Sequence, residues 1–326
     1  MADRRPRRTL VHIALGGTIA CVQTRAGLVP RLRAEALLAR ARVPAGVRVR
    51  AIDMAQRTTL SPADWVALAR SVARVHDACD GIVVTLGTDT LAYAAAALAV
   101  ILRHLGKPVV LTGAMRPMAG ARSDGPRNLS DALRVASARG IAGVLVVFAG
   151  RILAGSAVSK TRTAGDAAFE SVTGSPLGRL TGDRIVWRVR PAASGGRLAL
   201  STRLETRVAT CKLTPAIDRA FVEALARHRG VLVEGYGDGN VPDELVAALS
   251  RLARRRLVVL ASQCTYGRVR HRYAGGRALL RAGALSSGGA TKETALARLM
   301  WALGRSRNRA AARRLFLAAG AARRRG

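Results

Sequence analysis

Two segments of the chain place threonine hydroxyls directly after apolar, strand-like runs. One is LGGTIA at residues 15–20, which carries Thr18, and the other is LGTDT at residues 86–90, which carries Thr88 and Asp89. Such turns most often cap the helix that follows, so each one alone is weak support for a catalytic site. If several of them gather at one sheet edge, a single crevice would hold hydroxyls, a carboxylate and free amide N–H groups. These are the parts that acyl chemistry needs.

Acyl transfer also requires a base and groups that bind the substrate. Gly17 and Gly87 precede the two threonines, and glycine there lets a ligand approach the backbone and its N–H groups. Lys160 is the candidate base, because lysine is unusual in a chain whose 54 basic residues are nearly all arginine. Its amine would need partial burial or local positive potential to lower its pKa; otherwise it is an ordinary surface lysine.

Other chemistries find less support in the sequence. The GYGDGN segment at residues 235–240 does not have the GxGxxG spacing of a dinucleotide site, and neither GxSxG nor GxxxxGK[ST] occurs. The 4 cysteines are far apart without a CxxC pair, and the 5 histidines follow no metal-ligand or catalytic spacing. We therefore expect reduced cysteines and structural or solvent-facing histidines.

Short apolar runs that resemble strands alternate with helix-length segments rich in Ala, Leu and Arg. This alternation favours an α/β fold, in which helices cover both faces of a parallel sheet and the carboxyl ends of the strands form the binding crevice. A chain of 326 residues with 49% hydrophobic composition is long enough for two such domains. The predicted helices lie near residues 33–41, 61–77, 90–105, 127–139 and 291–303.

The expected division places the candidate threonines in a first domain at residues 1–190. A linker follows at 191–210, where Pro, Ser, Gly and Arg become frequent and strand or helix periodicity is lost. A second domain at 211–326 resumes the alternation. Its closing segment, from residue 305, is predicted to be an amphipathic helix with a frayed basic end.

The formal net charge of +34 predicts nonspecific adhesion to polyanions. The arginines are nevertheless scattered along almost the whole chain, which favours a compositional bias over a designed surface, so we expect no specific nucleic acid partner. The apolar run from Leu10 to Leu15 is too short for a signal peptide, and no run of about 18 apolar residues follows. The expected location is the cytoplasm, without membrane attachment.

An ordered set of segments covering nearly the whole chain resembles the bacterial L-asparaginases that use threonine nucleophiles. Each motif alone has moderate specificity, but the ordered set is strong. The SQC segment and the closing TKETALARL are more similar to the cytoplasmic type I enzymes than to the secreted type. The segments are LGGTIA (15–20), TLGTDTLAYAA (85–95), KPVVLTGAMRPMAGARSDGPRNLSDAL (107–133), AVSKTRTAGDAAFES (157–171), GYGDGNVP (235–242), SQCTYG (262–267) and TKETALARLMWAL (291–303).

The resemblance implies a larger N-terminal parallel-sheet domain, a smaller C-terminal α/β domain, and hydrolysis of L-asparagine to L-aspartate and ammonia. It implies no metal or organic cofactor. Thr18 matches the nucleophile that forms a β-aspartyl ester with the substrate. Thr88, Lys160 and Asp89 match a proton relay, and which threonine attacks first stays open. Asp89 is also expected to hold the substrate's α-amino group.

Two further substrate-binding positions follow from the resemblance. Ala114 in TGAMRP matches a residue whose backbone carbonyl lies near the leaving amide. Asn240 in GDGN matches a residue that reaches the site from the partner subunit. The chain is therefore expected to form a homo-oligomer, a dimer or a tetramer, with active sites between paired subunits.

Leu86, directly before GTDT, stands where relatives often have His or Thr, and two further positions depart from the family pattern. Leu28 stands where the family has a tyrosine that hydrogen-bonds the nucleophile, so either Thr24 or a water activates Thr18, or catalysis is slow. The serine that binds the substrate carboxylate has no clear match. Alignment offers Arg57 or Thr58, and either side chain can bind a carboxylate.

Two other functions stay open. A glutaminase-like subunit of a tRNA-dependent amidotransferase would release ammonia to a partner synthase, and the positive net charge would suit tRNA. A degenerate, noncatalytic homologue that binds aspartate or asparagine would account for the two departures from the family pattern. The joint presence of both threonines, the carboxylate and the lysine favours the amidohydrolase over such a binding protein.

Overall fold

The chain forms two compact units, with the boundary between Thr202 and Arg203. The computed structural model describes residues 8–193 and 195–321. The basic start of the chain, at residues 1–7, and the basic end expected at residues 322–326 lie outside the described residues. The boundary between the units falls inside the segment predicted to be a linker, residues 191–210.

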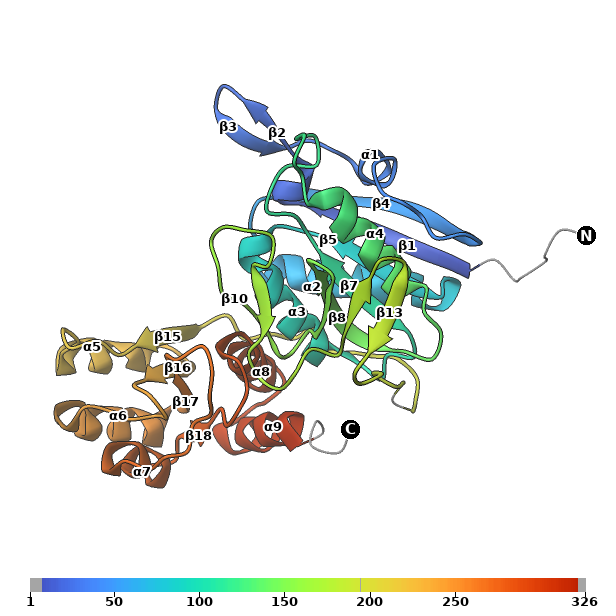
Figure 1. The fold of residues 1–326 in the computed structure, drawn as a ribbon. Helices are drawn as coiled ribbons and strands as arrows, with labels where there is room; N and C mark the ends of the chain where they lie inside the picture. The colour runs from blue at the N-terminus through green and yellow to red at the C-terminus, as the bar shows by residue number, and fades with distance from the viewer. Residues whose placement is uncertain (1–7, 194, 322–326) are drawn as a thin grey trace, which may run out of the picture. The chain divides into compact units, whose positions relative to one another are not determined.

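The first unit is built on one eight-stranded sheet (Figure 1). Its five neighbouring parallel strands confirm the expected fold class. Three antiparallel strands extend the sheet on one side, which the alternation of apolar runs did not predict. In spatial order the strands are Arg184–Trp187 (β13), Gly178–Thr181 (β12), Arg151–Ala154 (β9), Gly143–Phe148 (β8), Pro108–Thr112 (β7), Gly81–Thr85 (β5), Arg8–Gly16 (β1) and Val47–Arg57 (β4).

Helices cover this sheet on both faces. Ala34–Leu38 (α1) and Gly125–Ala136 (α4) share one hydrophobic core with sheet residues such as Val83. Among the described residues, that core takes none from Pro62–Val75 (α2) or Thr88–Ile101 (α3), and α3 contacts β7 and β8 from the opposite face. Burial on both sides explains why β5 and β7 are continuous apolar runs rather than alternating ones.

A sequence signal accounts for the start of α2, whereas α3 starts away from its predicted position. Ser61 begins α2 with a capping box, because its hydroxyl accepts from the Asp64 N–H and the Asp64 carboxylate accepts from the Ser61 N–H. The helix predicted at 90–105 begins two residues earlier, at Thr88. Thr88 and Asp89 therefore belong to the first turn of α3 and not to a loop before it.

Short strands complete the first unit. Cys21–Thr24 (β2) and Gly27–Pro30 (β3) form a hairpin shortly after β1 (Figure 1). Ala199–Leu200 (β14), inside the predicted linker, pairs with Leu102–Arg103 (β6). Part of the segment without periodicity is therefore held in the first unit by backbone pairing, which needs no side-chain pattern.

The second unit is a smaller α/β unit, as expected, built on a parallel sheet of four strands. In spatial order these are Val208–Lys212 (β15), Gly230–Gly235 (β16), Leu257–Ser262 (β17) and Leu285–Ser286 (β18). The predictions for 291–303 and for the closing segment agree with the last two helices. The helices are Arg219–Ala224 (α5), Asp243–Arg255 (α6), Ala274–Arg281 (α7), Lys292–Gly304 (α8) and Arg309–Ala321 (α9).

Candidate active site

The two turns that carry the threonines touch each other through their glycines. After β1 the chain enters a short 3-10 turn at Thr18–Ala20 (η1). Gly17 has φ +76°, and a Cβ added to it would lie 2.2 Å from the backbone nitrogen of Gly87. Only glycine fits this contact, so glycine at position 17 allows the turns bearing Thr18 and Thr88 to lie against one another.

The end of β4 packs against the same two turns. The Gly17 N–H donates to the Arg57 carbonyl at 2.7 Å. A Cβ added to Gly87 would lie 2.1 Å from the Thr58 carbonyl oxygen. The Gly17 N–H is thus used inside the protein, which corrects the expectation that this amide is free to bind a ligand.

Lys160 joins Thr88 and Asp89 in one hydrogen-bonded group. It is the last residue of Val158–Lys160 (β10), which pairs with Phe169–Ser171 (β11). Its Nζ donates to Thr88 Oγ1 at 2.9 Å and to Asp89 Oδ1 at 2.7 Å. Thr88 is buried, the Lys160 side chain is 21% exposed, and the Asp89 side chain is 73% exposed. The hydroxyl is therefore sheltered, while the carboxylate faces solvent.

The first turn of α3 has no side-chain cap. Gly87 is the residue before the helix, and it offers no hydrogen-bonding side chain. Thr88 and Asp89 lie inside the helix, so the alternative that they only cap it is wrong. The N–H groups of this turn carry partial positive charge and suit a developing oxyanion.

Thr18 differs from Thr88 in its surroundings. Its side chain is partly exposed, and its hydroxyl makes no hydrogen bond to any group in the described part of the chain. Behind it, the Cys21 thiol donates to the Gly17 carbonyl at 3.3 Å, and burial raises the pKa of that thiol. Cys21 therefore supports the turn and does not compete as a nucleophile.

The loop after β7 forms a wall beside Thr88. A Cβ added to Gly113 would lie 2.7 Å from the Leu86 carbonyl oxygen and 3.4 Å from Thr88 Cγ2. The next residue, Ala114, is fully buried. Within the first unit, contacts connect Gly17, Arg57, Thr58, Gly87, Thr88, Asp89 and Lys160. The other two predicted site residues of that unit, Thr18 and Ala114, directly follow Gly17 and Gly113 in the chain.

Two buried polar residues beside this loop had no predicted role. Asp124 accepts hydrogen bonds from the Met115 and Arg116 N–H groups, both at 2.9 Å. Asn128 donates to the Gly113 carbonyl at 3.1 Å and to Asp124 Oδ2 at 3.0 Å. Their signal in the sequence is an Asp and an Asn four residues apart at the start of an apolar helix, in SDGPRNL.

Asp64 holds the Arg57 guanidinium. Arg57 Nε lies 3.5 Å from Asp64 Oδ1, and the two side chains are 55% and 18% exposed. The Asp64 carboxylate also accepts from the Ser61 N–H at 2.8 Å and from the Ser61 hydroxyl at 2.7 Å. Partial burial opposes ionisation, but the Ser61 hydrogen bonds and the Arg57 charge outweigh it and lower the pKa of the Asp64 carboxyl.

The β2–β3 hairpin offers no substitute for the missing tyrosine. Leu28 lies opposite Gln23 and is 46% exposed. The Thr24 hydroxyl donates to the Gly27 carbonyl at 2.8 Å, which closes the hairpin turn. Thr24 is therefore committed to the hairpin, which corrects the suggestion that it activates Thr18.

Asn240 belongs to the second unit, so it is not among the residues that the first unit brings together. It ends the turn after β16, where Tyr236 and Asn240 exchange backbone hydrogen bonds of 2.9 and 2.8 Å. Its Oδ1 accepts from the Val241 N–H at 2.9 Å. The side-chain amide nitrogen makes no hydrogen bond to a described residue and can contact a ligand.

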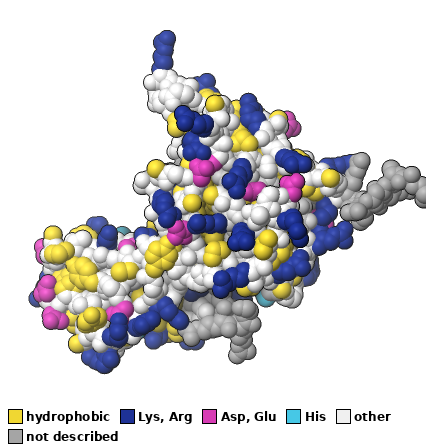
Figure 2. Space-filling view, in the orientation of Figure 1, with side chains coloured by type: hydrophobic (Ala, Val, Ile, Leu, Met, Phe, Trp, Pro, Cys, Tyr) yellow, Lys and Arg dark blue, Asp and Glu magenta, His cyan; other side chains and the backbone are white. Residues whose placement is uncertain are grey.

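Features of other kinds of site are sparse. The described residues contain no group of three or more His, Cys, Asp or Glu side chains that could hold a metal ion. Within residues 8–193 and 195–321, no helix has both the length and the apolar composition needed to cross a bilayer. Figure 2 shows Lys and Arg side chains spread over the visible face instead of forming one stripe.

Two family models match the chain. The model described as "Asparaginase, N-terminal" matches residues 9–193. The model described as "Glutaminase/Asparaginase C-terminal domain" matches residues 207–316. Together they cover both units.

Relatives and solved structures give the same similarity. The chain is 38% identical over 308 residues to an L-asparaginase of Thermococcus kodakarensis, covering 92% of this chain and 94% of that protein. The solved structure of the thermostable L-asparaginase from that organism matches with a TM-score of 0.89 and 37% identity over 94% of this chain and 96% of the other. An L-asparaginase I from Vibrio cholerae matches with a TM-score of 0.82 and 28% identity, covering 96% and 97%.

A second group of relatives differs in length. The chain is 34% identical over 273 residues to a glutamyl-tRNA(Gln) amidotransferase subunit of Pyrococcus abyssi. The match covers 79% of this chain and 62% of that protein. The chain therefore spans less than two thirds of this relative.

Proposed function

The chain belongs to the asparaginase family, and on that premise we propose that it hydrolyses L-asparagine to L-aspartate and ammonia through an ester on a threonine. One observation carries the proposal. The Lys160 amine contacts both Thr88 Oγ1 and Asp89 Oδ1, beside the turn that bears Thr18. A hydroxyl within hydrogen-bond reach of a base, with that base held by a third group, is the arrangement that nucleophilic catalysis requires.

The first half-reaction forms the ester on Thr18. Its hydroxyl oxygen attacks the side-chain amide carbon of asparagine, and the C–N bond breaks as nitrogen gains a proton and leaves as ammonia. Thr18 suits this role because its hydroxyl is partly exposed and makes no hydrogen bond to a described group. The first-turn N–H groups of α3 are suited to stabilise the negative charge that develops on the carbonyl oxygen.

Thr88 and Lys160 move the protons. In its neutral form the Lys160 amine accepts the proton of Thr88, and Thr88 takes the proton of the attacking hydroxyl. Asp89, 2.7 Å from Nζ, stabilises the ammonium that results. The relay then passes this proton to the leaving nitrogen, which departs as ammonia and leaves Lys160 neutral again. In the second half-reaction the same relay activates a water, which attacks the ester, releases aspartate and restores Thr18.

The two charged ends of asparagine have complementary partners. The exposed Asp89 carboxylate is placed to bind the α-ammonium group. The half-exposed Arg57 guanidinium is placed to bind the α-carboxylate as a charged fork. Arg57 is favoured over Thr58 because a guanidinium matches the charge of the carboxylate and a hydroxyl does not.

We further propose that the protein is a cytoplasmic homo-oligomer of the type I class. In this proposal Asn240 reaches the site of a partner subunit and contacts the substrate with its side-chain amide. The SQC segment, the closing TKETALARL and the similarity to an L-asparaginase I support the type I assignment.

Ammonia release is the direct test. The protein is incubated with L-asparagine, and we expect ammonia and aspartate in equal amounts. Thr18→Val removes the hydroxyl at nearly constant volume and should lower kcat by at least about 1,000-fold, the scale on which loss of an acting nucleophile is felt. Unchanged turnover in Thr18→Val would contradict the assigned nucleophile. Acid quenching followed by peptide mapping then shows whether the aspartyl ester sits on residue 18 or residue 88.

The alternatives predict other outcomes of the same assay. An amidotransferase subunit would need tRNA and a partner for full turnover, whereas the proposed enzyme needs neither. A noncatalytic homologue would bind aspartate in calorimetry and release no ammonia. The higher identity to the L-asparaginase relative, 38% against 34% for the amidotransferase relative, favours the enzyme that acts on free asparagine.

A further inference from the structure

We propose that Asp124 and Asn128 are positioning residues for this reaction, an inference that rests on the proposed amidohydrolase function. Neither side chain contacts the reacting hydroxyls. Together they hold the backbone that carries Ala114 and forms the wall beside Thr88.

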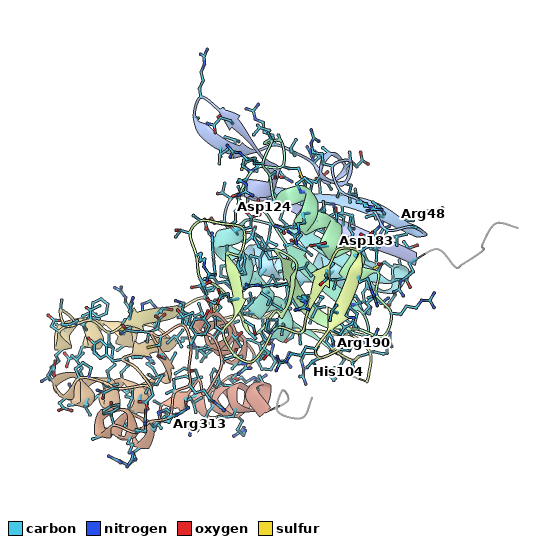
Figure 3. The ribbon with its side chains drawn as sticks, in the orientation of Figure 1. Arg48, His104, Asp124, Asp183, Arg190 and Arg313 are labelled. Atoms are coloured by element: carbon cyan, nitrogen blue, oxygen red, sulfur yellow. The ribbon has the colours of Figure 1, made fainter. Side chains whose placement is uncertain are left out.

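Asp124 anchors the loop that follows β7. It lies at the amino end of α4 (Figure 3) and is 6% exposed. It accepts hydrogen bonds from the Met115 and Arg116 N–H groups, both at 2.9 Å, and from Asn128 Nδ2 at 3.0 Å. Three N–H donors on one buried carboxylate fix the direction as well as the place of this backbone.

Asn128 hydrogen-bonds both the loop after β7 and the turn between β8 and β9. It is 1% exposed, its Nδ2 donates to the Gly113 carbonyl at 3.1 Å, and its Oδ1 accepts from the Ala149 N–H at 3.0 Å. Ala149 has φ +48°, a left-handed conformation that a residue with a side chain keeps only when its surroundings hold it. Asn128 thus joins the carboxyl end of β7 to the turn between β8 and β9.

Gly113 connects the loop held by Asp124 and Asn128 to Thr88. A Cβ on Gly113 would lie 2.7 Å from the Leu86 carbonyl oxygen and 3.4 Å from Thr88 Cγ2. A shift of Gly113 therefore moves the surface on which Thr88 rests, and with it the 2.9 Å contact between Thr88 and Lys160. Ala114 moves in the same displacement. A misplacement of about 1 Å at a reacting group can cost about 100-fold in rate.

A second connection leads from Asp124 toward the lysine. The Arg116 N–H is bound to Asp124, and the Arg116 guanidinium pairs with Asp166 at 2.7 Å. Asp166 lies in the segment between β10, which ends at Lys160, and β11. The paired side chains are 43% and 55% exposed, so this ion pair is weak by itself. Because Asp124 fixes the backbone of Arg116, it also helps to position the segment between β10 and β11 that carries Asp166.

Isosteric substitutions test the inference. Asp124→Asn places one oxygen and an NH₂ group against three N–H donors. Asn128→Asp places a carboxylate oxygen against the Gly113 carbonyl and Asp124 Oδ2. For each variant we expect kcat to fall about 100-fold below the wild-type value. KM for asparagine and Kd for aspartate should change less than about threefold, because the proposed ligands of the charged ends are untouched.

Ser130→Ala is the matched control on the same helix. The Ser130 hydroxyl donates to the Pro126 carbonyl and accepts from the Arg42 N–H at 2.8 Å. It has no contact with the loop after β7 in the described residues. The control should lose stability with kcat unchanged.

The double variant Asp124→Asn with Asn128→Asp restores one amide–carboxylate pair. A kcat above the value expected from multiplying the two single effects would support direct coupling of the two residues. A lower Tm with wild-type kcat per folded molecule, in Asn128→Asp as well as in Asp124→Asn, would overturn the inference. Failure of the proposed function is a separate result, since it shows as a wild-type protein that releases no ammonia.

Discussion

Arg57 is the residue at which the chemistry of this chain departs most from the family pattern. Alignment with the family offers Arg57 or Thr58 where a serine binds the substrate carboxylate, and the Arg57 guanidinium is held by Asp64 at 3.5 Å. A guanidinium forms a charged, two-pronged contact with a carboxylate, while a hydroxyl donates a single bond. In our proposal Arg57 takes this position, which changes how the substrate is held and leaves the relay of Thr88 and Lys160 untouched.

Substitution of this arginine separates binding from chemistry. We expect Arg57→Gln to raise KM for asparagine at least about tenfold, the scale of one charge-assisted hydrogen bond, with kcat within about threefold of wild type. Steady-state kinetics measure both constants. Thr58→Val is the matched control, and a KM that rises in Thr58→Val but not in Arg57→Gln would assign the carboxylate to Thr58.

At the scale of elements, β1 and β5, which lead into the turns bearing Thr18 and Thr88, are joined by a buried polar pair. His12 Nε2 lies 2.9 Å from Thr85 Oγ1, and both residues are fully buried. Thr85 ends β5, two residues before Gly87. Burial, opposed by the Asp53 charge, lowers the pKa of His12 from 6.5 to about 4. The histidine is therefore structural, as expected, and neutral in the folded protein at neutral pH.

This burial makes stability depend on pH in a defined direction. The folded protein keeps His12 neutral down to about pH 4, while the unfolded chain takes up a proton below about pH 6.5. The contribution of neutral His12 to the free energy of unfolding is therefore complete above pH 6.5. It is lost as the pH falls toward 4, by about 3 kcal/mol in total. Urea unfolding at pH 7.5, 6 and 5 should show wild type losing stability faster than His12→Asn. Parallel curves for the two proteins would refute this account.

At the scale of the whole molecule, the predicted site residues are divided between two units. Nine of the ten belong to the first unit, which holds the residues proposed as nucleophile, relay and substrate-binding groups. Asn240 belongs to the second unit, in the turn that follows β16. If Asn240 acts on the site of a partner subunit, assembly is a condition for activity and not only for stability.

Mixing two inactive variants tests that condition. Thr18→Val and Asn240→Ala should each be inactive as pure proteins. After joint refolding, a mixed dimer contains one site with an intact Thr18 and an intact Asn240 from its partner. Random dimers should therefore recover about a quarter of wild-type activity. No recovery, with mixed assemblies shown by mass spectrometry, would place Asn240 in the site of its own chain.

The sequence by itself determined the class of fold and the residue types available for catalysis. Alternating apolar runs predicted the parallel sheets, because burial on both faces imposes that pattern locally. Glycine before each threonine predicted close approach of a ligand to the backbone, whereas the structure shows Gly17 packed against Gly87. Ordered motifs predicted the family. These are properties of single elements, or of neighbours along the chain.

Only the tertiary structure decided how those parts are connected. Lys160 and Thr88 are 72 residues apart, and no local pattern states that their side chains meet at 2.9 Å. The same holds for Asp124, whose three hydrogen-bond donors come from a loop and a helix. It also holds for Arg57, whose ion pair depends on where β4 ends relative to α2. A hydrogen bond tolerates changes of only a few tenths of an ångström in the donor–acceptor distance. These distances are set when separate elements pack together.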